Sequence, residues 1–83
     1  MTETFGDPQG GRGGLFHGDP SSSRFDELFV DDKNQIIGVI STNPPPDLRE
    51  TLEQLTRVKP PVDGLEDEIR QADFDLNLLL ALD

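Results

Sequence analysis

The stretch LFVDDKNQIIGVIS, residues 28–41, places an acidic turn between two apolar runs. The second run, residues 36–40, is rich in β-branched side chains, which lose less conformational freedom in a strand than in a helix. Asp31 and Asn34 suit turn positions because their short side chains can bond to nearby backbone groups. We therefore predict a β-hairpin over residues 27–41.

This phrase resembles the hairpins of CBS regulatory modules and of several sensor domains, in which a strand ends in acidic turn residues and returns toward a glycine. Here that glycine is Gly38. The resemblance covers residues 28–41 alone, so it implies a hairpin and carries over no ligand-binding residue.

The segment that follows the hairpin, residues 46–58, has the pattern of an amphipathic helix. Leu48, Leu52 and Leu55 recur at intervals of four and three residues, which places them on one helical face. Pro46 suits the first turn, where its missing N–H has no helical partner to lose. We predict a helix over this range that packs on the hairpin.

Residues 64–82 predict a second helix, although their last part also fits a strand. Leucine and alanine favour a helix, and Asp63 can cap its start. After Phe74, however, apolar residues also fall on every second position, which is the period of a strand. A helix over residues 64–82 is our prediction, and a strand over residues 74–82 stays open as its alternative.

Glycine dominates the segment before the hairpin. Residues 1–24 hold six of the eight glycines, a composition typical of flexible segments. We predict a disordered tail over residues 1–24, including a solvated His17, and one small domain over residues 25–83. The expected fold class is α+β, a small β-hairpin with two C-terminal helices behind a disordered Gly-rich N-terminal tail.

Charge sets the class of partner. The chain carries 17 Asp and Glu against 7 Lys and Arg, a formal net charge of -10. This charge repels nucleic-acid phosphates and anionic lipid surfaces, so we expect neither nucleic acid nor membrane as a direct partner. A basic protein surface is the complementary partner. Without a basic start followed by an apolar run, we expect a cytoplasmic location.

The sequence offers little for catalysis or metal binding. It has no cysteine and a single histidine, so we predict no enzymatic activity. Asp73, Asp75 and Asn77 match the opening of an EF-hand calcium loop, but Leu78 stands where that loop needs glycine. We therefore expect neither a metal site nor a cofactor.

The C-terminal stretch ADFDLNLLLALD, residues 72–83, carries the candidate partner-binding residues. They combine apolar anchors with flanking carboxylates: Phe74, Leu76, Leu78, Leu79, Leu80, Leu82, Asp73 and Asp75. Residues 76–80 satisfy Leu-x-x-Leu-Leu and so resemble the short helical motif that docks into grooves on nuclear receptors. The alternation of acids and leucines also resembles activation-domain segments. The same leucines could instead form the core of the domain.

These observations together predict a small acidic protein-protein interaction module without catalytic activity. It would be a regulator or accessory subunit of a larger complex and would dock through the C-terminal leucine-rich segment. Its partner is expected to be a protein with an apolar groove and a basic rim, and a second copy of the chain is a further candidate. The alternative is a charge mimic, in which the carboxylates of residues 63–75 inhibit a nucleic-acid-binding protein.

Overall fold

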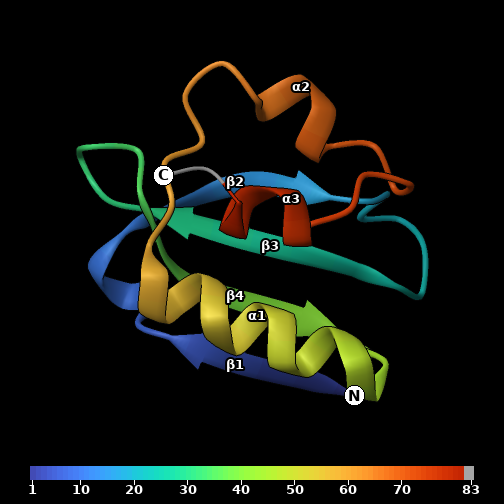
Figure 1. The fold of residues 1–83 in the computed structure, drawn as a ribbon. Helices are drawn as coiled ribbons and strands as arrows, with labels where there is room; N and C mark the ends of the chain where they lie inside the picture. The colour runs from blue at the N-terminus through green and yellow to red at the C-terminus, as the bar shows by residue number, and fades with distance from the viewer. Residues whose placement is uncertain (82–83) are drawn as a thin grey trace.

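The computed structural model describes residues 1–81, in which a four-stranded antiparallel sheet is covered on one face by three helices (Figure 1). The strands are β1 (Thr2–Gly6), β2 (Arg12–His17), β3 (Phe25–Val30) and β4 (Ile36–Thr42). The helices are α1 (Pro46–Val58), α2 (Glu66–Ile69) and α3 (Asn77–Leu80), and a 3-10 turn, η1 (Pro8–Gly10), joins β1 to β2. The expected α+β class is confirmed.

The predicted hairpin is formed by β3 and β4. Its turn is organised by Asp31, whose Oδ1 accepts hydrogen bonds from the N–H groups of Lys33 (2.9 Å) and Gln35 (3.0 Å). Asn34 adopts a positive φ of 60°, which asparagine tolerates better than most residues. Asn and Asp were the turn signals in the sequence, and they act here as predicted.

The predicted disordered tail over residues 1–24 is wrong. That segment supplies both edge strands, because the sheet order is β1-β4-β3-β2 and β1 pairs with β4 while β2 pairs with β3. Three strands follow one another through hairpins and β1 returns beside β4, which is a Greek-key arrangement. The glycines serve the fold, since Gly14 adopts a φ of 98° where the β2 register shifts.

The connection from β1 to β2 passes close to β4 at Gly38. A Cβ at this position would lie 2.7 Å from the carbonyl carbon of Asp7 and closer still to the nitrogen of Pro8. Both are backbone atoms, which cannot move aside as the end of a side chain can. Gly38 therefore permits the close approach that brings β1 and β2 to opposite edges.

The helix predicted over residues 46–58 is confirmed as α1, which lies over β4 and β1. Leu52 and Leu55 are fully buried beneath it. The helix ends at Val58, and the next residue, Lys59, has a φ of 58° and a ψ of 56°, in the left-handed region typical of helix C-termini.

The predicted helix over residues 64–82 is interrupted. α2 and α3 are each four residues long, and the chain turns between them. Just before α3 the carboxylate of Asp75 accepts a hydrogen bond from the N–H of Asn77 (2.9 Å), a local bond that competes with helical backbone bonding. The alternative strand is absent from the described part of this segment. Leu82 lies outside the described residues.

The core lies between the sheet and the helices. Ten apolar side chains in it are at most 8% exposed: Leu15, Leu28, Ile36, Val39, Leu52, Leu55, Val62, Ile69, Leu76 and Leu79. They come from β2, the hairpin, α1 and the C-terminal segment alike, so each of these parts contributes to stability. No helix in the described residues has the length and apolar character needed to span a bilayer.

Candidate functional site

A row of polar side chains crosses the helix-covered face of the sheet. The register pairs Glu3 with Ser41, Ser41 with Asp26, and Asp26 with His17, so one residue from each strand belongs to it. Residues directly opposite on neighbouring strands point to the same face. We call Glu3, Ser41, Asp26 and His17 the polar row. The neighbouring row on this face is apolar and consists of Phe5, Val39, Leu28 and Leu15.

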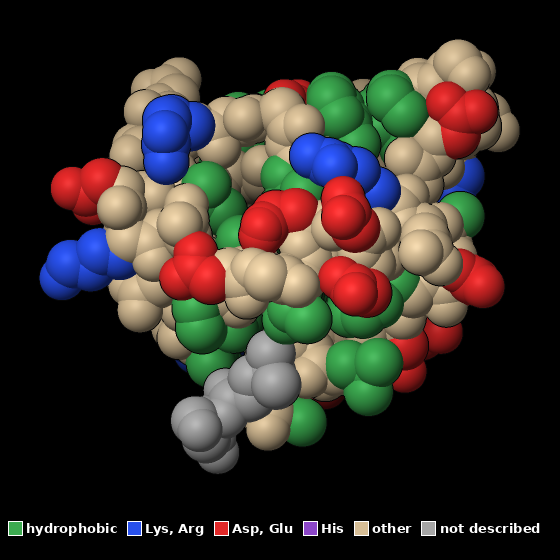
Figure 2. Space-filling model, turned by 90° about the horizontal axis from the view of Figure 1, so that it is seen from above, with side chains coloured by type: hydrophobic (Ala, Val, Ile, Leu, Met, Phe, Trp, Pro, Cys, Tyr) green, Lys and Arg blue, Asp and Glu red, His purple; other side chains and the backbone are tan. Residues whose placement is uncertain are grey.

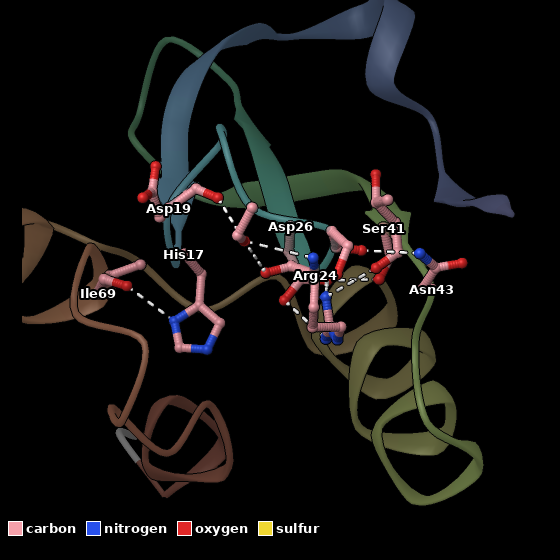
Figure 3. A network of polar contacts seen from close by, with 10 residues as sticks. His17, Asp19, Arg24, Asp26, Ser41, Asn43 and Ile69 are labelled. Atoms are coloured by element: carbon pink, nitrogen blue, oxygen red, sulfur yellow. Dashed lines mark hydrogen bonds and ion pairs between the residues drawn. The ribbon is translucent and has the colours of Figure 1, made fainter.

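Asp26 is the centre of the polar row and is fully buried. Arg24 donates two hydrogen bonds to its carboxylate, at 2.9 and 3.2 Å, and the hydroxyl of Ser41 donates another (Figure 3). Arg24 also donates to the backbone oxygen of Thr42 (3.2 Å). Ser41 is also fully buried, so the Asp26 carboxylate and the Ser41 hydroxyl are out of reach of a substrate. Their bonds instead join β3 to β4.

His17, at the end of the polar row, joins the sheet to α2. Its Nδ1 lies 2.8 Å from the carbonyl oxygen of Ile69, which only accepts, so Nδ1 carries the proton (Figure 3). The ring lies edge-on to Phe74 with centroids 6.5 Å apart. The N–H of Gly18 donates to the oxygen of Arg70 (3.2 Å) beside it. The expectation of a solvated His17 is wrong, because β2 carries the ring under the helical layer.

A small pocket of about 100 Å³ adjoins this end of the row and is lined by His17, Gly18, Arg24, Phe25 and Ala72. Small-molecule sites usually occupy roughly 300–1,000 Å³, so this pocket suits a few waters rather than a substrate. Within residues 1–81 no group of three or more His, Cys, Asp or Glu is placed to hold a metal ion.

The predicted partner-binding residues divide between core and surface. Leu76 and Leu79 belong to the core, at 2% and 0% exposure, while Leu78 is 55% exposed. The others that are described are the partly buried Phe74 and Leu80, which pack against the core, and the exposed Asp73 and Asp75. Among the apolar residues of this set that the structure describes, Leu78 is therefore the side chain that the fold leaves most accessible.

An acidic face surrounds α2. Five of its carboxylates belong to exposed residues and one to a partly buried residue: Asp63, Asp67, Glu68, Asp73, Asp75 and Glu66. Arg70 pairs with Asp67 at 3.1 Å and cancels one of these charges. Figure 2 views the molecule from above, where acidic side chains lie among hydrophobic ones. We call residues 63–75 the acidic face.

The sheet face opposite the helices carries an apolar patch that the sequence prediction missed. Its register rows are Thr2–Thr42–Phe25, then Thr4–Ile40–Glu27–Phe16, then Gly6–Gly38–Phe29. All three helices lie on the other face (Figure 1). We call Phe16, Phe25, Phe29 and Ile40 the outer patch. These four side chains are only partly buried, and the rings of Phe16 and Phe25 are 6.0 Å apart.

Glu27 lies within the outer patch. Its carboxylate accepts a hydrogen bond from the N–H of Gly14 (3.0 Å), which fixes the side chain over β2. The sequence indicated part of the outer patch, because Phe25, Glu27 and Phe29 alternate with Asp26 and Leu28. In a strand this alternation places the two phenylalanines on one face. A strand that is apolar on both faces gives no indication of which face the helices cover.

Neither a family model nor a curated protein sequence matches this chain.

Proposed function

We propose that this chain is a small acidic protein-protein interaction module without catalytic activity, a regulator or accessory subunit that binds its partner through the outer patch. The observation that supports the proposal is the partial exposure of three phenylalanines and an isoleucine on the sheet face opposite the helices.

An antiparallel sheet with one covered face usually presents polar side chains on the other face. Here the outer rows combine Phe16, Phe25, Phe29 and Ile40 with threonines at the β1 side. Aromatic side chains are enriched in the buried centres of protein interfaces, where a few of them supply most of the binding energy. A contiguous apolar patch rimmed by polar residues is typical of such a docking surface.

The charge of the chain indicates the kind of partner. Glu27 sits within the outer patch, and the chain carries a formal net charge of -10. A complementary surface would be apolar with a lysine or arginine directed at Glu27, and the long-range attraction would speed association. From the sequence we expected a partner with a basic rim around the C-terminal leucine-rich segment. We keep a basic partner surface but place it opposite the outer patch of the sheet.

Photo-crosslinking tests the proposal and compares the two candidate surfaces. A benzoylphenylalanine replaces Phe25 in one variant and Leu78 in a matched variant, because both side chains are accessible but lie on opposite faces of the sheet. The proposal expects a discrete adduct from residue 25 that Phe16→Thr and Glu27→Lys both abolish. Adducts from residue 78 alone would place docking at the C-terminal leucines instead, and adducts that ignore both substitutions would reject the outer patch.

A charge mimic is the second candidate function, and the acidic face favours it. Six carboxylates within residues 63–75 surround a single Arg70. If they imitate nucleic-acid phosphates, binding should weaken steeply as salt rises and DNA or RNA should displace the chain. Neutralising Asp73 and Asp75 together as asparagines should weaken that binding, while Phe25→Thr should leave it unchanged. Binding that ignores salt would reject this candidate.

A further inference from the structure

The free edge of β1 is ready to pair with another strand. Hydrogen bonds from Asn43 N–H to Met1 O (2.7 Å) and from Asp7 N–H to Ile37 O (2.9 Å) bracket its pairing with β4. In an antiparallel ladder the hydrogen-bonded positions alternate, so Glu3 and Phe5 direct their backbone groups to β4. The N–H and C=O groups of Thr2, Thr4 and Gly6 therefore point outward, and all three residues are exposed.

The opposite edge of the sheet is protected. The register of β2 shifts between Arg12 and Leu15, and Gly14 has a φ of 98° there. Near its other end, the N–H of Gly18 already bonds to Arg70 O. Bulges and covering segments are the usual devices that block pairing at a sheet edge. β1 pairs with β4 through five consecutive residues without a register shift, so these devices protect β2 and leave β1 open.

The open edge is complementary to itself. If Thr4 faces Thr4 of a second copy, a two-fold axis passes between them and Thr2 faces Gly6 of the copy. Each of these three pairs joins residues whose backbone groups point outward, so every pair is of the hydrogen-bonded kind. Glu3 then lies opposite Phe5 of the copy, and no carboxylate faces its own equivalent.

Charges on this side of the molecule are balanced. Arg49 of α1 pairs with Glu3 at 2.7 Å, and Arg57 pairs with Glu53 at 3.0 Å. Arg49, Glu53 and Arg57 lie on the same side of α1 as Thr56. That side is next to β1, because a Cβ added at Gly6 would meet the Thr56 side chain. Two positive and two negative groups thus neutralise one another beside β1, whereas the acidic face around α2 would repel its own copy.

We infer that this chain forms a two-fold symmetric dimer by antiparallel pairing of β1 with β1 of a second copy, joining two four-stranded sheets into one of eight strands. Residues directly opposite in such a pair project to the same face. The two outer patches therefore lie on one side of the joined sheet and could engage a two-site partner, which raises avidity. The dimer itself does not depend on the function proposed for that patch.

Sedimentation equilibrium across roughly 0.01 to 1 mM protein measures the association, since a short edge contact predicts a weak dimer. The wild-type chain should shift from monomer toward dimer over this range. Thr4→Pro removes the outward N–H at the two-fold axis, which the fold itself does not use, and should raise the dimer dissociation constant about tenfold or more. Thr4→Val keeps that N–H and should bind like wild type. A monomer throughout, or a dimer that Thr4→Pro leaves unchanged, would overturn the inference.

A cysteine scan tests the register and stays informative if Thr4→Pro fails to fold. The described residues contain no cysteine, so an engineered one has no native partner. In the proposed register two Cys at position 4 face each other with Cα atoms about 5.5 Å apart, within the disulfide range of roughly 4.4–6.8 Å. Two Cys at position 2 are offset by roughly 13 Å along the strands. Thr4→Cys should oxidise to a covalent dimer readily and Thr2→Cys should not; equal yields would contradict this register.

Discussion

Arg24 and Asp26 lie two residues apart at the start of β3, and the guanidinium of Arg24 holds both carboxylate oxygens of the fully buried Asp26, at 2.9 and 3.2 Å. A fully buried carboxylate needs such bonds because burial removes it from water. The pair holds Asp26 in place within the polar row. It lies at the end of the sheet next to the loop that connects β2 to β3.

Asp26→Ala should therefore destabilise the fold by about 3 kcal/mol. The substitution removes the acceptor of Ser41 and leaves Arg24 unpaired, although the Arg24 side chain is 33% exposed and water can solvate part of it. Urea unfolding followed by circular dichroism measures the change in free energy. Glu27→Ala, at the next residue on the outer face, is the matched control and should cost less than about 1 kcal/mol. Equal losses would contradict a structural role for the buried pair.

His17→Leu should loosen the contact between β2 and α2. The substitution removes the donor to the Ile69 carbonyl, which then stays buried without that bond, at a cost of about 1–2 kcal/mol. Hydrogen exchange provides the local measurement, because the Gly18 amide bonds to Arg70 O at the same contact and should exchange faster. Phe16→Leu, on the other face of β2, should leave that amide protected. Unchanged protection of Gly18 in the His17 variant would show that the histidine does not hold the two elements together.

The parts of the fold that the sequence predicted correctly are those that local chemistry determines. Asp31 and Asn34 specify the turn of the hairpin whatever surrounds it, and Leu48, Leu52 and Leu55 define the buried face of α1 by spacing alone. Both elements form from residues close together in the sequence. Their boundaries were accordingly close to the observed ones.

The N-terminal segment was predicted wrongly because distant residues decide its structure. β1 is a strand because Thr2 to Gly6 pair with Thr42 to Gly38 in β4, a partner that composition cannot reveal. The prediction of a tail over residues 1–24 also left Phe16 outside the expected sheet. The prediction of one long C-terminal helix was wrong for a different reason. The spacing of apolar residues gives no information about the turn that the Asp75 side chain forms before α3.

Leu79→Ala and Leu78→Ala separate core from surface within one four-residue helix. Leu79 is fully buried and Leu78 is 55% exposed. Removing the Leu79 side chain should leave a cavity and cost about 3 kcal/mol, while Leu78→Ala should change stability by less than about 0.5 kcal/mol. Chemical unfolding of the two variants under identical conditions gives the comparison. Similar losses at both positions would mean that the C-terminal segment packs differently from this arrangement.

The turn of the hairpin should contribute a pH-dependent stability through Asp31. The N–H groups of Gln35 and Lys33 bond to its carboxylate, and Lys33 and Lys59 add positive charge, so the pKa of Asp31 is lowered. A group whose folded pKa is lowered stabilises the fold above its unfolded pKa of about 4 and loses that contribution as pH falls through the folded value.

Asp31→Asn should therefore make stability less sensitive to pH between neutrality and acid, because the amide oxygen still accepts hydrogen bonds but does not titrate. Thermal unfolding at a series of pH values checks the slope, and the carboxyl carbon shift of Asp31 reports its pKa directly. Asp32→Asn is the control at the neighbouring turn position. A carboxyl titration of Asp31 above that of an unstructured peptide would contradict this assignment.

Gly38→Ala should disrupt the crossing of η1 over β4. The added Cβ would meet backbone atoms of Asp7 and Pro8, so the N-terminal segment must shift rather than a side chain turning aside. We expect a loss of at least about 2 kcal/mol in the free energy of unfolding. Gly64→Ala provides the contrast, since its surroundings are open within 4 Å and only its φ of 78° opposes the substitution, at about 1 kcal/mol. Amide shifts of Gly10 and Gly11 should move in the Gly38 variant and stay in place in the Gly64 variant. If the Gly38 variant were as stable as wild type with unchanged shifts, the N-terminal segment could not cross the sheet at this point, and the placement of β1 and β2 at opposite edges would need revision.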